Sequence, residues 1–147
     1  YDFCDAAGMT RDEVLNVEMT PGWWGRALYY LNVARVEPIG VVLAMQFTQE
    51  GQMPALNGEV VIPALEKHYG LRKNDRAVVF FAEHELADVE HSSHQMALAT
   101  KYLDTPELQA RAEIVAEEMC RLRWGCTSDT YRMEHLNQWD EMPPGVE

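Results

Sequence analysis

Three residues of one segment have the types and the spacing of metal ligands. His84, Asp88 and His91 lie within the stretch 80–94. At about 100° per residue, Asp88 lies about 40° from His84 around a helix, and His91 lies about 20° on the other side. The three side chains therefore project from one narrow stripe, which Gln95 extends by a turn. Two imidazoles and a carboxylate suit iron or manganese, so the stripe predicts a first-row metal site able to support dioxygen chemistry.

A metal needs ligands from more than one helix, and Glu50 is the candidate from elsewhere in the chain. It ends an apolar stretch that Gly51 and Pro54 interrupt. A simpler interpretation is also open. In it, Glu50 is a solvated acid at a helix end, and the stripe arises by chance because the helix is acidic. The apolar neighbours Phe80 and Phe81 favour the metal interpretation, because buried ionisable groups need a partner such as a cation.

The element that must carry the stripe is a long helix over 77–103, a range with neither Gly nor Pro. Two Thr-Pro pairs, at 20–21 and 105–106, each predict an N-cap followed by proline in the first turn. Further helices are predicted over 10–15, 39–47, 60–68 and 107–136, with a break or kink between Gly51 and Gly58 and a stop at 142–145. The Val-rich patches lie inside helical periodicity, so the prediction is an all-α bundle.

Composition excludes several classes of function. The 147 residues, 47% of them hydrophobic, suit a single all-helical domain over 1–147. Twelve Lys and Arg against 24 Asp and Glu give a net charge of −12, which disfavours nucleic acid and anionic membranes as partners. With no apolar run near the roughly 20 residues of a membrane span and no signal peptide, we expect a cytoplasmic protein. Cys4, Cys120 and Cys126 show no metal-binding spacing and are predicted to be free thiols.

The spacing also distinguishes between types of helical metal protein. A ferritin-like di-iron bundle takes a Glu-x-x-His motif from each of two helices, and this chain contains none. The stretches 50–54, 68–71 and 80–92 instead resemble the heme-oxygenase-like di-iron oxidases and oxygenases. Within that family the resemblance is to the branch of pyrroloquinoline-quinone synthase and the death-domain-associating protein. It covers roughly residues 10–125.

The resemblance implies a heme-free helical bundle with a non-heme iron site, or an iron–manganese site, that activates dioxygen to oxidise a small molecule. It assigns Glu50, His84, Asp88 and His91 as metal ligands. It also implies that Met45, Phe47 and Phe81 line the pocket.

The resemblance further implies a Glu and a His from a helix at the beginning of the domain. No histidine precedes Glu50 in this chain. We therefore expect the sequence, which begins at Tyr1, to be the C-terminal two-thirds of such a domain, without its first helix or helices. Four ligands should hold a single metal weakly, and the apolar groove left by the missing helix should be covered in a homodimer.

Three functions remain open at this stage. The first is a non-heme iron oxidoreductase that uses Fe2+, or Mn2+, and dioxygen on a small-molecule substrate. The second is a cofactor-less oxidase like the quinone synthases, in which His84 and His91 move protons. The third is a helical interaction protein without catalysis.

Overall fold

The computed structural model describes residues 1–138, and within that range the chain is helical without a strand. The all-α prediction is confirmed, whereas the heme-oxygenase-like topology and the single-domain boundaries stay predictions. The predicted stop at 142–145 lies outside the described residues. The helices in chain order are α1 (Asp2–Ala6), α2 (Arg11–Leu15), α3 (Pro21–Val36), α4 (Ile39–Glu50), α5 (Met53–Ala55), the π-helix η1 (Leu56–Val61), α6 (Ile62–Tyr69), the 3-10 helix η2 (Arg76–Val78), α7 (Val79–Tyr102), α8 (Pro106–Thr130) and the π-helix η3 (Tyr131–His135).

Threonine side chains start three of the helices, as the sequence predicts. Thr20 and Thr105 accept hydrogen bonds from the backbone N–H groups of Trp23 and Leu108, and proline occupies the first turn in both cases. Thr10 forms a complete capping box with Glu13. Each of these caps satisfies backbone N–H groups that have no partner inside the helix.

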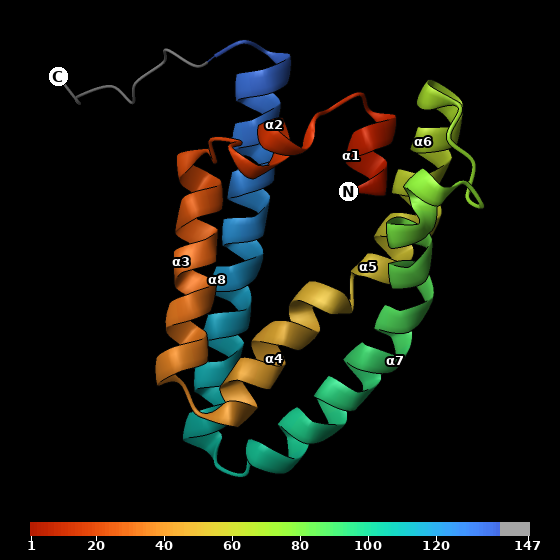
Figure 1. Cartoon of the computed structure of the whole chain (residues 1–147). Helices are drawn as coiled ribbons and strands as arrows, with labels where there is room; N and C mark the ends of the chain where they lie inside the picture. The colour runs from red at the N-terminus through yellow and green to blue at the C-terminus, as the bar shows by residue number, and fades with distance from the viewer. Residues whose placement is uncertain (139–147) are drawn as a thin grey trace, which may run out of the picture.

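Three long helices surround the main hydrophobic core. In Figure 1, α3 and α8 run side by side, and α4 crosses between α8 and α7. The buried core between α3, α4 and α8 consists of six residues: Val33, Val41, Met45, Ala112, Val115 and Met119. A second, smaller cluster at the other end of α7 contains Ile62, Leu65 and Val78. Between the two clusters, α4 and α7 pack directly against each other, and this contact sets the relative position of the candidate ligands.

A glycine allows the start of α4 to approach the end of α7 closely. A Cβ atom built on Gly40 would lie 3.0 Å from the carbonyl carbon of Tyr102 and 3.0 Å from a methyl group of Leu103. Only a residue without a side chain fits there without displacement. Gly40 therefore permits the close contact between the start of α4 and the end of α7.

The predicted break or kink between Gly51 and Gly58 is a short turn followed by continuous helical backbone. The helix ends at Glu50, a turn at Gly51 and Gln52 follows, and α5 then continues through η1 into α6 without leaving helical backbone geometry. Gly70 ends α6 with a positive φ of 70°, the left-handed conformation that glycine adopts without strain.

The surface retains many apolar side chains. On α7, Leu86 is 71% exposed, Val89 57% and Met96 44%. Trp124 on α8 is 79% exposed.

The three cysteines are free thiols, as predicted. None of the described helices combines the length and the apolar character that a bilayer crossing requires.

Candidate metal centre

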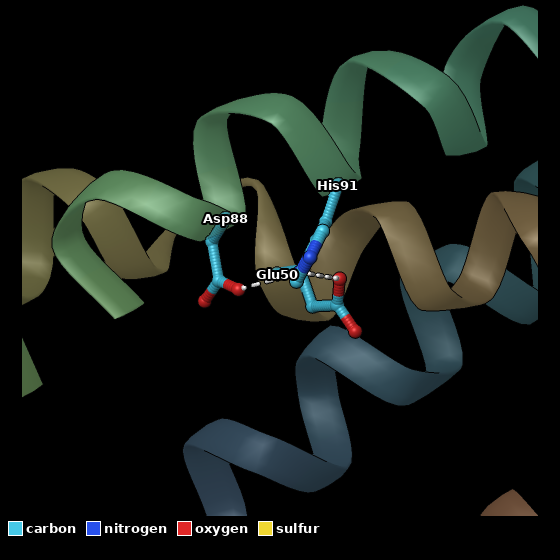
Figure 2. Close-up of side chains that lie close together, drawn as sticks. All are labelled: Glu50, Asp88 and His91. Atoms are coloured by element: carbon cyan, nitrogen blue, oxygen red, sulfur yellow. Dashed lines mark ion pairs between the residues drawn. The ribbon is translucent and has the colours of Figure 1, made fainter. Parts of the chain in front are cut away.

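Glu50, Asp88 and His91 come together between α4 and α7. Figure 2 shows Glu50 at the end of α4 and the other two side chains projecting towards it from α7. His91 Nδ1 lies 3.4 Å from Asp88 Oδ1 and 3.8 Å from Glu50 Oε2. One donor atom of each residue lies within 4.8 Å of the other two. Three of the four predicted ligands thus share one site.

The burial of the three side chains is unequal. Asp88 is 2% exposed, and its Oδ2 atom has no hydrogen-bond partner among the described residues. Glu50 is half-buried, and the His91 side chain is 58% exposed. The site is therefore anionic and closed at Asp88, and it opens to solvent at His91.

Two glutamines hold the Glu50 carboxylate in place. Gln95 donates from Nε2 to Glu50 Oε2 at 2.6 Å. Gln46 donates from Nε2 to the other carboxylate oxygen, and Tyr30 of α3 donates its hydroxyl hydrogen to Gln46 Oε1. Because each carboxylate oxygen can accept more than one bond, both retain capacity towards a cation.

His84 lies outside this group, one turn before Asp88. Its Nδ1 atom lies 2.7 Å from the backbone oxygen of Phe80. A carbonyl can only accept, so Nδ1 carries the hydrogen, and in the neutral tautomer with that hydrogen Nε2 is the acceptor. Histidines that bind metals commonly have this arrangement. The imidazole also packs against the Phe80 ring, with 4.2 Å between ring centroids. The tautomer of His84 suits a ligand, while its position is separate from the other three.

The predicted pocket-lining residues divide between the two cores. Met45 is fully buried in the cluster between α3, α4 and α8, and Phe81 packs against the cluster of Ile62, Leu65 and Val78. Phe47 lies on α4, where its ring would contact a Cβ atom added at Gly51. Met45 and Phe81 thus contribute to stability on either side of the site.

Sequence reasoning missed two polar residues beside the site and one buried polar residue farther along the chain. Tyr30 and Gln46 belong to the network around Glu50, and Gln46 precedes Glu50 by one helical turn, a spacing that could have signalled it. Asn57 in η1 is fully buried, and neither polar atom of its side chain has a hydrogen-bond partner among the described residues. Nothing in the local sequence distinguishes Asn57 from a loop asparagine beside Gly58.

The donor set fits a divalent first-row cation. Ligand atoms about 2.1 Å from one ion lie about 3 Å apart when they occupy adjacent positions, so small side-chain rotations would bring the three donors to bonding distance. Asp88 supports this fit, because its carboxylate is buried with Oδ1 towards His91 and Oδ2 without a partner among the described residues, and a cation would neutralise that buried charge. One imidazole and two carboxylates suit iron or manganese, whereas structural zinc sites typically use cysteine thiolates.

The comparisons with known proteins are limited but consistent. No family model matches the chain, and no solved structure matches it. Over 88 residues the chain is 35% identical to a protein of Nitrosomonas europaea named 4-aminobenzoate synthase. The matched stretch is 60% of this chain and 35% of that protein, so the chain spans about a third of the length of the curated relative. This similarity covers too little of the relative to define a family for the chain.

Proposed function

We propose that this chain holds the metal of a dioxygen-dependent oxidase that acts on a small molecule. Glu50, Asp88 and His91 are the proposed ligands, and His84 is the fourth once its ring turns away from Phe80. A bound Fe2+, or Mn2+, would supply the electron chemistry that dioxygen requires. The observation that carries the proposal is the convergence of three donor residues from two helices, one of which, Asp88, is a buried carboxylate.

The side chains of this site have separate tasks in the proposal. Asp88 supplies a fixed negative charge from the closed side, because helix packing buries it. Gln46 and Gln95 orient the Glu50 carboxylate. The exposed edge at His91 is where a small molecule and dioxygen would enter.

The similarity to a protein named 4-aminobenzoate synthase supports a synthase or oxidase with a small-molecule substrate. The match spans about a third of that protein. An activity like that of the whole relative is therefore part of the proposal. We also propose that the protein is cytoplasmic and that it acts without nucleic acid or membrane.

The test is an anaerobic titration of the metal-free protein with Fe2+ or Mn2+, followed by elemental analysis. We expect one weakly held metal per chain. His91→Ala should lower the affinity by more than about tenfold, since loss of even an indirect partner of a metal ligand typically costs that much. His84→Ala should produce a smaller loss.

His94→Ala is the matched control, because His94 is exposed on the same helix and lies off the ligand stripe. It should bind metal like the unaltered chain. Equal losses from His91→Ala and His94→Ala would contradict the proposed site. Oxygen consumption that survives removal of all metal would favour the cofactor-less oxidase instead.

A further inference from the structure

Two arginines from different helices meet at one residue of α4. Arg26 of α3 donates from Nη2 to the side-chain oxygen of Gln49 at 2.8 Å. Arg123 of α8 donates from Nη1 to the backbone oxygen of Gln49 at 3.0 Å. Gln49 is buried and immediately precedes the candidate ligand Glu50. Two positive charges thus converge on the residue before Glu50, on the side of α4 that faces α3 and α8.

The two guanidinium groups have no anionic partner among the described residues. No carboxylate there lies within ion-pair distance of Arg26 or Arg123, although four other arginines each pair with an acid: Arg76, Arg111, Arg121 and Arg132. Three exposed arginines, Arg11, Arg35 and Arg72, also lack an ion pair within residues 1–138, whereas Arg26 and Arg123 are half-buried, so water compensates their charges less. Burial lowers the pKa of Arg123, and the positive charge of Arg26 lowers it further.

Most of the donor capacity of the pair is unused. A guanidinium has five N–H donors in a rigid fork that matches a carboxylate. Arg26 uses one on Gln49, and its buried Nε has no partner among the described residues. Arg123 directs a second donor to the sulfur of Met53, which is a weak acceptor. The strong acceptor that this geometry suits is absent from the described part of the chain.

Neighbouring contacts fix the position of Arg26. Its guanidinium lies 5.4 Å from the centroid of the Trp23 ring. The Trp23 indole N–H in turn donates to the Thr130 hydroxyl of α8 at 2.9 Å. An arginine that is anchored in this way loses less entropy when it binds a ligand.

We propose that Arg26 and Arg123 form a binding site for the carboxylate of a small organic acid. The acid lies between α3, α8 and the end of α4, and its charge neutralises the two guanidinium groups. In assigning this acid as the molecule that is oxidised at the neighbouring centre, the inference rests on the proposed function. Carboxylate binding itself requires no metal.

The experiment measures binding of benzoate to the metal-free full chain by calorimetry or NMR titration. Benzoate is the probe because it joins a carboxylate to a ring that can pack near Trp23, and benzyl alcohol is its uncharged counterpart. We expect benzoate to bind and benzyl alcohol not to bind. Arg123→Gln and Arg26→Gln should each weaken benzoate binding by about tenfold or more, the loss typical of a hydrogen bond between charged groups.

Arg35→Gln is the matched control, because Arg35 is exposed on α3 and its loss changes the net charge equally. It should leave benzoate affinity unchanged. Arg123→Lys keeps the charge without the fork and should restore part of the affinity, and circular dichroism would verify folding of each variant. Equal effects of Arg35→Gln and Arg123→Gln would overturn the proposal, as would inorganic phosphate binding in place of benzoate. Because the chain is free of metal throughout, failure here is distinguishable from failure of the metal titration.

Discussion

At the scale of single residues, Asp88 combines burial with an oxygen that has no partner. A carboxylate in this position loses hydration without gaining a full set of hydrogen bonds, which disfavours the folded state unless a cation is present. The contact of 3.4 Å between Asp88 Oδ1 and His91 Nδ1 offsets only part of that cost. The metal-free protein should therefore be under local electrostatic strain at this residue.

Replacement of the Asp88 carboxylate should change the stability of the metal-free protein and the stabilisation by metal in opposite directions. In Asp88→Asn the side chain keeps its shape and loses its charge, so the free energy of unfolding of the metal-free protein should rise by about 1 kcal/mol. The additional stabilisation that Fe2+ or Mn2+ gives the unaltered chain should disappear. Thermal unfolding with and without metal measures both quantities.

Glu90→Gln is the control for the Asp88 substitution, because Glu90 is exposed on the same helix. It should change neither quantity. A metal-free Asp88→Asn protein that is less stable and still gains stability from metal would exclude the ligand role.

A tyrosine on α3 gives a prediction about alkaline pH. Burial, the hydrogen bond to the Glu118 carboxylate and the negative charge of that group together raise the pKa of Tyr29 to about 12. Below pH 10 the hydroxyl is protonated in both the folded and the unfolded chain. Between about pH 10 and 12 the unfolded tyrosine ionises while the folded one keeps its proton, so stability falls as pH rises.

Tyr29→Phe removes this titrating group and should flatten that part of the pH profile. Denaturant unfolding of both proteins at pH 8 and pH 11 measures the difference. Other tyrosines and the lysines titrate in the same range, so the comparison between the two proteins carries the result. Parallel profiles would show that the Tyr29 hydroxyl is free to ionise in the folded chain.

At the scale of elements, the helices with clear start signals were predictable and the irregular ones were not. Thr20 and Thr105 with their following prolines predicted the starts of α3 and α8, because a capping hydroxyl is a local interaction. The residues between Gly51 and Gly58 predicted only an interruption. Glycine and proline indicate where an ordinary helix is disfavoured, and they do not indicate that the chain forms a π-helix there, packed against α7.

The same distinction applies to the site. Helical periodicity placed Asp88 and His91 on one stripe of α7, and the structure brings Glu50 of α4 to them. Periodicity also placed His84 on that stripe, whereas the bond to Phe80 and the packing of the two rings hold it apart. Contacts between helices, such as the one from Tyr30 to Gln46, depend on tertiary packing and could not be predicted from a single segment.

The junction of α4 with the end of α7 gives a prediction at this scale. Gly40→Ala places a methyl group 3.0 Å from Tyr102 and Leu103, so we expect the free energy of unfolding to fall by about 1–3 kcal/mol. Gly25→Ala is the matched control, because nothing lies within 4 Å of the added methyl group in the middle of α3. It should raise stability by up to about 1 kcal/mol. Urea unfolding of the two variants measures both changes, and equal shifts would contradict the close approach.

At the scale of the whole molecule, α7 has two different faces, one polar and one apolar. Its ligand stripe faces α4, and on the far side of the helix Leu86, Val89 and Met96 are exposed. Residues at this spacing form one continuous face. An exposed apolar face of this kind is typical of a surface that is covered by another chain or segment.

We expect copies of the chain to associate through this face into the homodimer that the sequence predicts. Light scattering at micromolar concentration should give a mass above that of one chain, and Leu86→Gln should lower it. Because each copy carries a net charge of −12, added salt should strengthen the association. Leu15→Gln, at a 64% exposed position on the short α2, is the control. A monomer at all salt concentrations would contradict the expectation.

The π-helix η1 has a consequence for how this chain tolerates changes in length. A π-turn holds one more residue than the α-turn that it replaces. Deletion of one residue within 56–61 would therefore return this segment to an ordinary α-helix. Glu50 precedes that segment and Asp88 follows it. Related chains should therefore differ by single-residue insertions or deletions here sooner than inside α4 or α7. In those two helices the same event would rotate a ligand by about 100° away from its partners.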